Sequence, residues 1–271
     1  MSELGDARLL DRGAQAEIFE WGAGRVLRLL PADANPGQVE QEATVMRAAS
    51  AAGVPVPAVH DVVMIDGRPG MVMERIDGGP MLSAMLSRPW RLLPLARRFG
   101  EIQAAIHATA GPAGVVTIHE QARRQLERLG TGDAELRAWA ERELETLPGG
   151  DALLHGDYHP LNLLMTDGEP RVIDWPSVSI GPAEADIART RVLVEAAEPP
   201  NGSPVMLTLM GAFRTRVFVP WYLRGYGRVR AFDRGLVERW RTVRAIERLA
   251  EAPASEERVL RRMIAGRVRA G

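Results

Sequence analysis

The stretch that decides the fold is LLHGDYHPLNLL at residues 153–164, with VIDW close behind it at residues 172–175. Together they place three oxygen-bearing side chains, Asp157, Asn162 and Asp174, on one short hairpin. Mg²⁺ prefers hard oxygen ligands and normally takes one or two protein carboxylates beside phosphate oxygens and water. Apolar residues flank the loop on both sides, so we expect them to anchor it to a packed core. The spacing suits phosphoryl transfer, which needs a base near the attacking hydroxyl and metal ligands nearby.

These segments resemble the catalytic loop of the aminoglycoside phosphotransferase and choline kinase-like family, a branch of the protein-kinase-like fold. The family's pattern is His-Gly-Asp, three or four spacers that often contain His-Pro, then Asn, and later Ile-Asp-Trp or Ile-Asp-Phe. Residues 155–162 and 173–175 match this pattern, and residues 181–188 closely match a further family feature, Gly-x-Pro-x-x-Asp-hydrophobic-Ala. The resemblance therefore rests on three separate motifs in the expected order.

The resemblance implies a role for each matched residue. Asp157 is expected to be the catalytic base that orients the acceptor hydroxyl. Asn162 and Asp174 are expected to bind Mg²⁺, with ATP or GTP as cosubstrate. His155 and Asp186 are expected to support the catalytic loop through hydrogen bonds.

The histidines show no ligand spacing for a metal site beyond one pair inside the loop. We interpret His159, a member of that pair, as a loop residue without a chemical role of its own. His107 lies in an apolar helical stretch, so we interpret it as a packed core residue.

The chain matches the nucleotide-binding part of the family pattern less closely. In the family, a turn between two strands and a lysine on the third strand hold the phosphates, and a helix glutamate pairs with that lysine. The turn here is residues 13–16, with Gly13 as its single glycine, and the chain has no lysine, so Arg28 stands at the lysine position. Arginine keeps the charge but is longer and planar. Glu42 falls on the buried stripe of the next helix and is the predicted partner of Arg28.

The adenine base is expected near the connector that follows the last strand of the first lobe. There, backbone groups of residues 73–76 would face the base edge, and we assign Glu74 and Ile76 to that contact.

The hydrophobic pattern changes along the chain and predicts an α+β protein with two lobes. We expect residues 1–76 to form a nucleotide-binding lobe with a small antiparallel sheet and one helix over 38–52. Residues 77–271 are expected to form a mainly helical lobe. The family resemblance implies that this lobe carries the catalytic loop and the acceptor site, and that the fold is bilobal and protein-kinase-like. The predicted strands are 7–12, 17–21, 25–30, 59–65 and 70–75, and the predicted helices of the second lobe are 90–110, 118–129, 133–147, 182–197, 205–224 and 235–250.

Composition excludes several other classes. The absence of cysteine excludes disulfide scaffolds, thiolate metal sites and cysteine nucleophiles, and the absence of lysine excludes pyridoxal-phosphate chemistry. A formal charge of −1 does not suit a nucleic-acid-binding polycation. No apolar run approaches the length of a membrane span, and the acidic start lacks a signal-type stretch, so a cytoplasmic protein without a membrane partner is expected. The oligomeric state stays open.

Two functions from different classes remain open. The first is a small-molecule kinase that phosphorylates a hydroxyl of a sugar, amino alcohol, nucleoside-like or macrolide-like acceptor, or a true aminoglycoside phosphotransferase. The second is a catalytically weak nucleotide-binding module, with Arg28 marking the loss of activity. A protein kinase fits poorly, because no long segment closing in Ala-Pro-Glu follows Asp174.

The charge of the C-terminal part favours an acceptor that is neutral, anionic or at most singly cationic. Residues 221–271 hold 13 arginines and 6 acids, a surplus that would repel a polycationic aminoglycoside. The acids that could cancel this surplus are Asp133, Glu135, Glu184 and Glu195.

Overall fold

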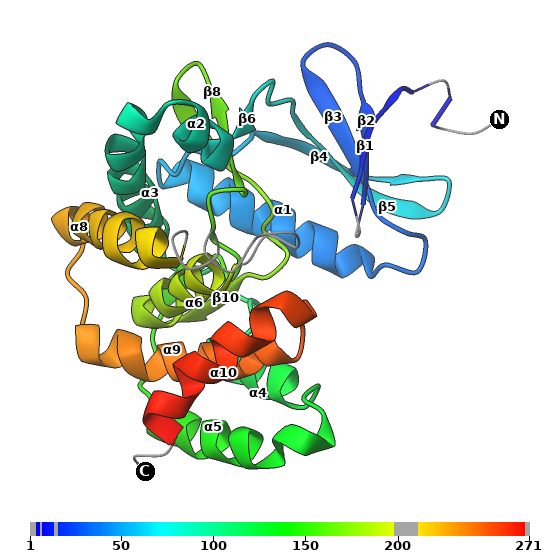
Figure 1. Ribbon diagram of the computed structural model, residues 1–271. Helices are drawn as coiled ribbons and strands as arrows, with labels where there is room; N and C mark the ends of the chain where they lie inside the picture. The colour runs from blue at the N-terminus through cyan, green and yellow to red at the C-terminus, as the bar shows by residue number, and fades with distance from the viewer. Residues whose placement is uncertain (1–3, 6, 14–15, 198–210, 269–271) are drawn as a thin grey trace.

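A five-stranded antiparallel sheet forms the N-terminal part of the protein (Figure 1). The computed structural model describes residues 4–5, 7–13, 16–197 and 211–268. Its strands run in the spatial order β1-β2-β3-β5-β4. Their bounds are β1 (Leu9–Arg12), β2 (Glu17–Glu20), β3 (Arg25–Leu29), β4 (Val59–Ile65) and β5 (Arg68–Glu74).

The central strand β3 shows why this sheet needs a helix on one face. Because side chains alternate along a strand, Leu27 and Leu29 share a face, and both are buried in a small cluster with Phe19. Arg28 faces the other way, toward helix α1 (Pro36–Ala51), the single helix predicted for this part of the chain. The helix begins where the Asn35 side chain accepts a hydrogen bond from the backbone of the first turn, and it packs against β4 and β5.

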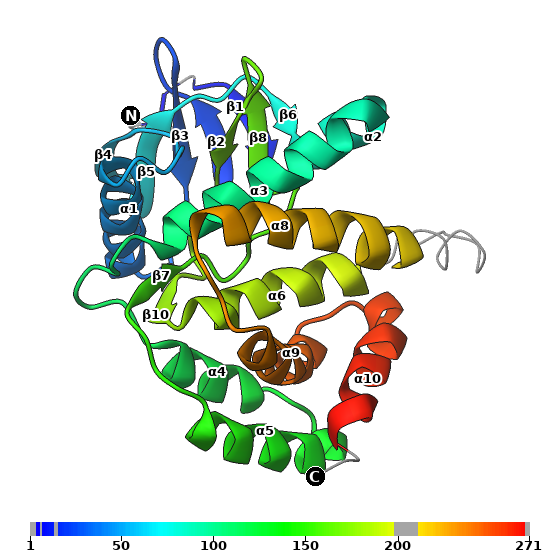
Figure 2. The same ribbon diagram turned by 90° about the vertical axis from the view of Figure 1, so that its left-hand side faces the viewer.

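The rest of the chain is mainly helical. Figure 2 shows α3, α8, α6 and α9 as successive layers below the sheet, with α4 and α5 at the far end. A π-helical turn at Arg214–Phe218 leads into α8. The helices are α2 (Met81–Ser87), α3 (Leu92–His107), α4 (Ile118–Leu126), α5 (Ala134–Thr146), α6 (Ala183–Ala196), α8 (Val219–Val229), α9 (Arg234–Leu249) and α10 (Ala254–Val268), with short 3-10 turns at Pro89–Arg91 and Thr131–Asp133.

The contact between α3 and α8 depends on two glycines. A Cβ atom on Gly100 would lie 2.1 Å from the Tyr222 carbonyl oxygen, and one on Gly225 would lie 2.0 Å from the Arg97 carbonyl oxygen. Both distances are far below van der Waals contact, so the two helix backbones touch where side chains are absent.

Two small sheets position the catalytic segments. Strand β7 (Ala152–Leu154) pairs with β10 (Ser179–Gly181), while β8 (Leu163–Thr166) lies between β6 (Gly79–Pro80) and β9 (Glu169–Val172). The loop with Asp157 and Asn162 therefore joins β7 to β8, and Asp174 follows β9.

Hydrogen bonds join these segments to the first lobe and to α2. The Val172 N–H donates to the Pro55 carbonyl over 2.7 Å, beside the end of α1. The Leu82 N–H donates to the Pro160 carbonyl over 3.1 Å and ties the catalytic loop to α2.

The predicted α+β fold class is confirmed, together with the small antiparallel sheet and its helix. The sequence analysis missed α2, α10, β6, β7 and β10. The strands and α2 span at most seven residues, too few for periodicity to reveal, while α10 is rich in charged residues that blur its apolar stripe. Of the helix predicted over 205–224, residues 205–210 lie outside the described part of the chain.

Candidate active site

Asp157 and Asn162 lie in direct contact at the centre of the site. The Asn162 side-chain amide donates both to the Asp157 carbonyl, over 3.0 Å, and to Asp157 Oδ2, over 3.1 Å. The Asn162 backbone closes the turn by donating to the His159 carbonyl over 2.9 Å. Since the amide nitrogen of Asn162 is committed to Asp157, its Oδ1 atom is the part of this side chain that a cation could use.

The backbone between these residues requires glycine at position 156. Gly156 has φ +80°, a left-handed conformation that strains other residues. A Cβ atom there would also lie 2.1 Å from the Ser177 carbonyl oxygen. The glycine of the motif therefore lets the catalytic loop lie directly on the segment that follows Asp174.

Asp186 is the buried acceptor that holds the start of the loop. Its carboxylate accepts from the His155 N–H (3.2 Å), the Gly156 N–H (2.8 Å), the Gln103 side-chain amide (3.0 Å) and His107 Nε2 (3.0 Å). Burial acts to raise the pKa of Asp186, but these donors, His107 first among them, outweigh it and hold the pKa far below its ordinary value. The carboxylate is therefore ionised, as a group accepting four donors should be.

His155 joins the two halves of the site through its imidazole. Its Nδ1 accepts from the Asp157 N–H over 3.3 Å, and its Nε2 donates to the Ile173 carbonyl over 3.2 Å, next to Asp174. The ring packs on the buried Trp175 with centroids 4.6 Å apart. Complete burial lowers the pKa of His155, against the opposing influence of Asp186 and Asp157, so the imidazole is neutral.

The electrostatics of Asp157 favour an ionised carboxylate. Partial burial acts to raise its pKa, but His159 and Arg189 outweigh that effect and keep the pKa below its ordinary value. The His159 Nε2 atom lies 3.5 Å from Asp157 Oδ2, so this histidine faces the carboxylate, a relation not expected from the sequence. An ionised carboxylate can accept the proton of a hydroxyl placed against it.

Asp174 sits in a strained and accessible position. It has φ +66°, one of three non-glycine residues among those described with positive φ, and its side chain is exposed. The other two, Asp66 and Asp167, lie in hairpin turns where this conformation is common. Strain of this kind outside a hairpin tends to occur at functional sites.

The nucleotide side contains the ion pair expected from the sequence. Arg28 Nη1 lies 2.6 Å from Glu42 Oε2, and both side chains are largely buried, 12% and 7% exposed. Gly13 begins the turn between β1 and β2, where its N–H donates to the Ala16 carbonyl over 2.9 Å; residues 14 and 15 lie outside the described part.

The connector after β5 has fewer free backbone groups than expected. The Glu74 N–H donates to the Ala58 carbonyl over 2.8 Å, and the Glu74 carboxylate accepts from the Ala58 N–H over 3.0 Å. The Arg75 N–H donates to the Gly24 carbonyl over 3.0 Å. A base that docks here would therefore have to find its hydrogen-bond donor beyond Arg75, which leaves Ile76 as the better candidate of the two assigned residues.

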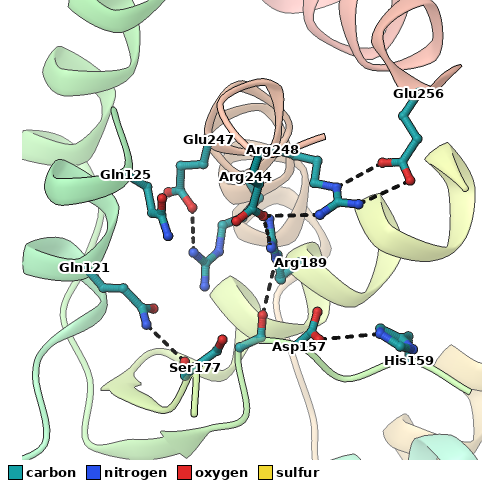
Figure 3. A network of polar contacts seen from close by, with 12 residues as sticks. Gln121, Gln125, Asp157, His159, Ser177, Arg189, Arg244, Glu247, Arg248 and Glu256 are labelled. Carbon is teal, nitrogen blue, oxygen red and sulfur yellow. Dashed lines mark hydrogen bonds and ion pairs between the residues drawn. The ribbon is translucent and has the colours of Figure 1, made fainter. Parts of the chain in front are cut away.

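A polar network connects helix α9 and its C-terminal end to the catalytic loop (Figure 3). Arg189 Nε donates to the Gly156 carbonyl over 3.2 Å, while its Nη2 pairs with Glu251. Nearby, Gln121 donates to the Ser177 carbonyl over 3.0 Å, on the segment that touches Gly156. The C-terminal helices thus fix the loop through Arg189.

One ion pair in this network is almost fully buried. Arg244 Nη1 lies 2.6 Å from Glu247 Oε2, and Arg244 Nε donates to the Ala185 carbonyl over 3.3 Å at the start of α6. The second atoms of the pair, Arg244 Nη2 and Glu247 Oε1, have no hydrogen-bond partner among the described residues. The two charges of the pair cancel, and the Arg244 side chain joins α9 to the start of α6, the helix that carries Asp186.

Sequence reasoning missed three positioning residues: Gln103, His107 and Arg189. His107 is buried, as expected of a core residue, but its ring also bridges Asp186 and the Tyr226 hydroxyl, which lies 2.8 Å from Nδ1. Arg189 could have been noticed, because it stands three residues after Asp186 on a helix and so shares its face. For Gln103 and His107 no comparable signal exists, since their partners lie about 80 residues away.

Part of the basic surplus of residues 221–271 is neutralised by ion pairs, so the net charge of this segment does not by itself describe the surface that an acceptor would meet. Five of its arginines, Arg239, Arg241, Arg244, Arg248 and Arg261, pair with acids, and two of the four acids that could have cancelled the surplus, Asp133 and Glu195, are among the partners. The pairs that reach outside the segment include Arg239 with Glu143, Arg241 with Glu195 and Arg261 with Asp133.

The donor set suits Mg²⁺ bound together with a nucleotide. Within the described ranges, no three His, Cys, Asp or Glu side chains are grouped closely enough to hold a metal by themselves. The residues that are present, the exposed Asp174 carboxylate and the Asn162 amide oxygen, fit a cation that takes few protein ligands and completes its shell with phosphate and water.

Comparison with known proteins identifies the class. The family model described as the phosphotransferase enzyme family matches residues 6–232, and the chain belongs to this family. The predicted enzyme class, a phosphotransferase acting on an alcohol group, is thereby confirmed. A search of curated proteins found no match. None of the helices in the described part has the length and apolar character that a membrane crossing requires.

Solved structures with the same fold are distant in sequence. An amicoumacin kinase, solved with AMP-PNP and Ca²⁺, is 15% identical with a TM-score of 0.68, and the match covers 97% of this chain and 88% of the other. A choline/ethanolamine kinase family protein from Mesorhizobium loti is 20% identical with a TM-score of 0.63, covering 98% and 87%. An aminoglycoside-3′-phosphotransferase of type VIII is 20% identical with a TM-score of 0.61, covering 89% and 93%. These similarities establish the kinase-like fold.

Proposed function

We propose that this protein transfers the γ-phosphate of ATP, or of GTP, to a hydroxyl of a small molecule in a Mg²⁺-dependent reaction. The observation that carries the proposal is the contact between Asp157 and Asn162, together with the accessible and strained Asp174. We also propose the division of labour along the chain: residues 1–76 hold the nucleotide, and residues 77–271 carry the catalytic loop and the acceptor site.

In the proposed reaction the acceptor oxygen forms a bond to the γ-phosphorus, and the bond from that phosphorus to the β–γ bridging oxygen breaks. Asp157 Oδ takes the proton of the attacking hydroxyl, and the hydrogen bond from Asn162 orients the carboxylate. Asn162 Oδ1 and Asp174 would hold Mg²⁺, which neutralises phosphate charge when bound. Arg28, oriented by Glu42, would contact the phosphates, while Gly13 and the backbone of Glu74 and Ile76 would line the nucleotide.

The hydrogen bonds of His155 and Asp186 support a structural role for these two residues. His155 and Asp186 take no part in the proposed proton transfer; they fix the loop, since His155 receives the Asp157 N–H and Asp186 receives those of His155 and Gly156. A catalytically weak nucleotide-binding module, the alternative, gives no reason for this many contacts to hold one carboxylate in place.

The test removes the base and the metal ligand separately. Asp157→Asn should lower turnover by at least about 100-fold, the lower range for loss of a general base, with nucleotide affinity retained. Asp174→Asn should also weaken nucleotide binding, and only when Mg²⁺ is present. Turnover is measured by nucleotide consumption across a panel of hydroxylated compounds, and affinity by calorimetry.

Asp167→Asn is the matched control, because Asp167 is an exposed turn aspartate with a similar positive φ. It should behave like the parent protein. Near-parental turnover by Asp157→Asn on an acceptor that the parent phosphorylates would contradict the base assignment. Mg²⁺-independent nucleotide binding by the parent would contradict the metal site.

A further inference from the structure

A large apolar cavity adjoins the catalytic loop. It has a volume of about 670 Å³, within the range of small-molecule sites, and fifteen residues of the described chain line it. Four of the fifteen are polar: His159, Arg214, Arg248 and Glu256. The other eleven are apolar, and they come from α2, the start of α3, the catalytic loop, the end of α6 and the turn before α8.

The cavity lies one side chain away from the proposed base. His159 lines it, and the Nε2 atom of His159 is 3.5 Å from Asp157 Oδ2. Leu161, next but one along the loop, also lines the cavity and is 51% exposed. A molecule whose hydroxyl contacts Asp157 can therefore extend past His159 into this space.

The carboxylate at the cavity wall is already paired. Glu256, the one carboxylate among the lining residues, accepts two hydrogen bonds from Arg248, over 2.9 and 3.2 Å. Figure 3 shows this pair on α9 and α10 on the same side of Asp157 as His159. Arg214 donates to the Ala197 carbonyl. The described wall thus has no free carboxylate for a polycation, and it has much apolar surface to cover.

We propose that the acceptor carries a bulky apolar body next to its reactive hydroxyl and has at most one positive charge, with the body seated in this cavity. The inference rests on the proposed kinase function, because it takes Asp157 to mark the position of the hydroxyl. The acceptor class follows from the apolar wall and from the pairing of Arg248 with Glu256. It does not depend on the net charge of the C-terminal segment.

The experiment uses two sugars that differ only in an apolar chain. n-Octyl β-D-glucopyranoside, below its micelle concentration, and D-glucose are titrated into the full chain with saturating AMP-PNP and Mg²⁺, and binding is followed by calorimetry. Octyl glucoside should bind at least tenfold more tightly than glucose, because only its chain can cover the cavity wall. Kanamycin, a polycation, should bind more weakly than octyl glucoside.

A matched pair of variants ties the binding to this cavity. Leu86→Arg places a charge on the wall at a position 67% exposed, where folding tolerates it, and should weaken octyl glucoside binding at least tenfold. Trp90→Arg alters another exposed apolar residue, 75% exposed and outside the cavity lining, and should leave the affinity unchanged. Leu86→Met should keep the parental affinity.

The outcomes separate this inference from the proposed function. Equal affinity for the two sugars, no detectable binding of octyl glucoside, tighter binding of kanamycin, or equal effects of Leu86→Arg and Trp90→Arg would each overturn the acceptor class. AMP-PNP affinity is measured in the same samples. Failure to bind this nucleotide with Mg²⁺, in a protein that still binds octyl glucoside, would overturn the kinase function and leave the cavity as an apolar binding site.

Discussion

Arg28 is the residue at which this chain departs from its family's pattern. Arginine carries the same charge as lysine but offers a planar fork of donors in place of a point charge. Its pairing with Glu42 places it in the setting that the family gives to lysine. We therefore interpret the arginine as a substitution that keeps the role, in a chain without any lysine.

Replacing this side chain tests the interpretation. Arg28→Met should raise the dissociation constant for the Mg²⁺-nucleotide complex about tenfold, the equivalent of one charge-assisted contact of about 1.4 kcal/mol. It should also lower the free energy of unfolding by about 3 kcal/mol, because Glu42 is left buried without its partner. Arg25→Met, on the same strand but at an exposed position, is the control and should change neither quantity. Nucleotide affinity is followed by calorimetry and unfolding by urea titration; parental affinity in Arg28→Met would exclude the phosphate role.

At the scale of elements, helix α3, which crosses α8, supports the loop that carries Asp157. Tyr158, inside the loop, donates its hydroxyl to the Phe99 carbonyl over 2.8 Å, next to Gly100 on α3. Its ring packs on Phe99 with centroids 4.3 Å apart. Helix α3, whose own position depends on its close contact with α8, therefore supports the residue next to Asp157.

Two glycines on the same helix make a direct test of this crossing. Gly225→Ala should lower the free energy of unfolding by about 1–3 kcal/mol, since the added methyl would meet the backbone of α3. Gly227→Ala, two residues on, would place its Cβ 3.7 Å from Phe232, an ordinary contact. It should stabilise the protein by up to about 1 kcal/mol through helix propensity. Urea titration measures the free energy of unfolding of both variants. Equal changes would show that the close approach of α3 and α8 does not contribute to stability.

At the scale of the whole molecule, two buried groups should make folding sensitive to acid. The pKa of His155 is lowered by burial, so below about pH 6.5 the unfolded chain takes up a proton that the folded chain does not. Stability that is present above that pH is therefore lost as the pH falls. Asp186, whose pKa is also lowered, adds a further loss only below about pH 4, where the unfolded carboxyl is protonated.

One variant can assign the first of these losses of stability to His155. Between pH 7 and pH 5, the unfolding free energy of the parent should fall with a contribution from His155 of up to about 1.4 kcal/mol per pH unit. His155→Gln should lower stability at pH 7 and remove that contribution to the slope. His60→Gln, at an exposed position, should keep the parental slope. Urea titrations at both pH values measure it, and an unchanged slope in His155→Gln would contradict a neutral buried imidazole.

Local motifs allowed part of this structure to be predicted from the sequence. The neighbouring strands predicted over 59–65 and 70–75, the helix that carries Glu42 and the pattern from His155 to Asp174 each depend on residues within about twenty positions of one another. For such features, the spacing along the chain fixes which side chains can meet. The N-terminal sheet, its helix and the loop that carries Asp157 and Asn162 belong to this class.

Long-range packing decided the rest. The bonds from Gln103 and His107 to Asp186 join residues about 80 positions apart, and no periodicity records such a partner. The same holds for the pairs of Arg241 with Glu195 and of Arg261 with Asp133, whose partners lie outside the segment over which composition counted a surplus of positive charge. Composition sums charges along the chain, whereas recognition depends on which of them remain unpaired once the helices have packed. The motif thus came from the sequence, but the apolar character of the cavity beside Asp157 came only from the tertiary structure.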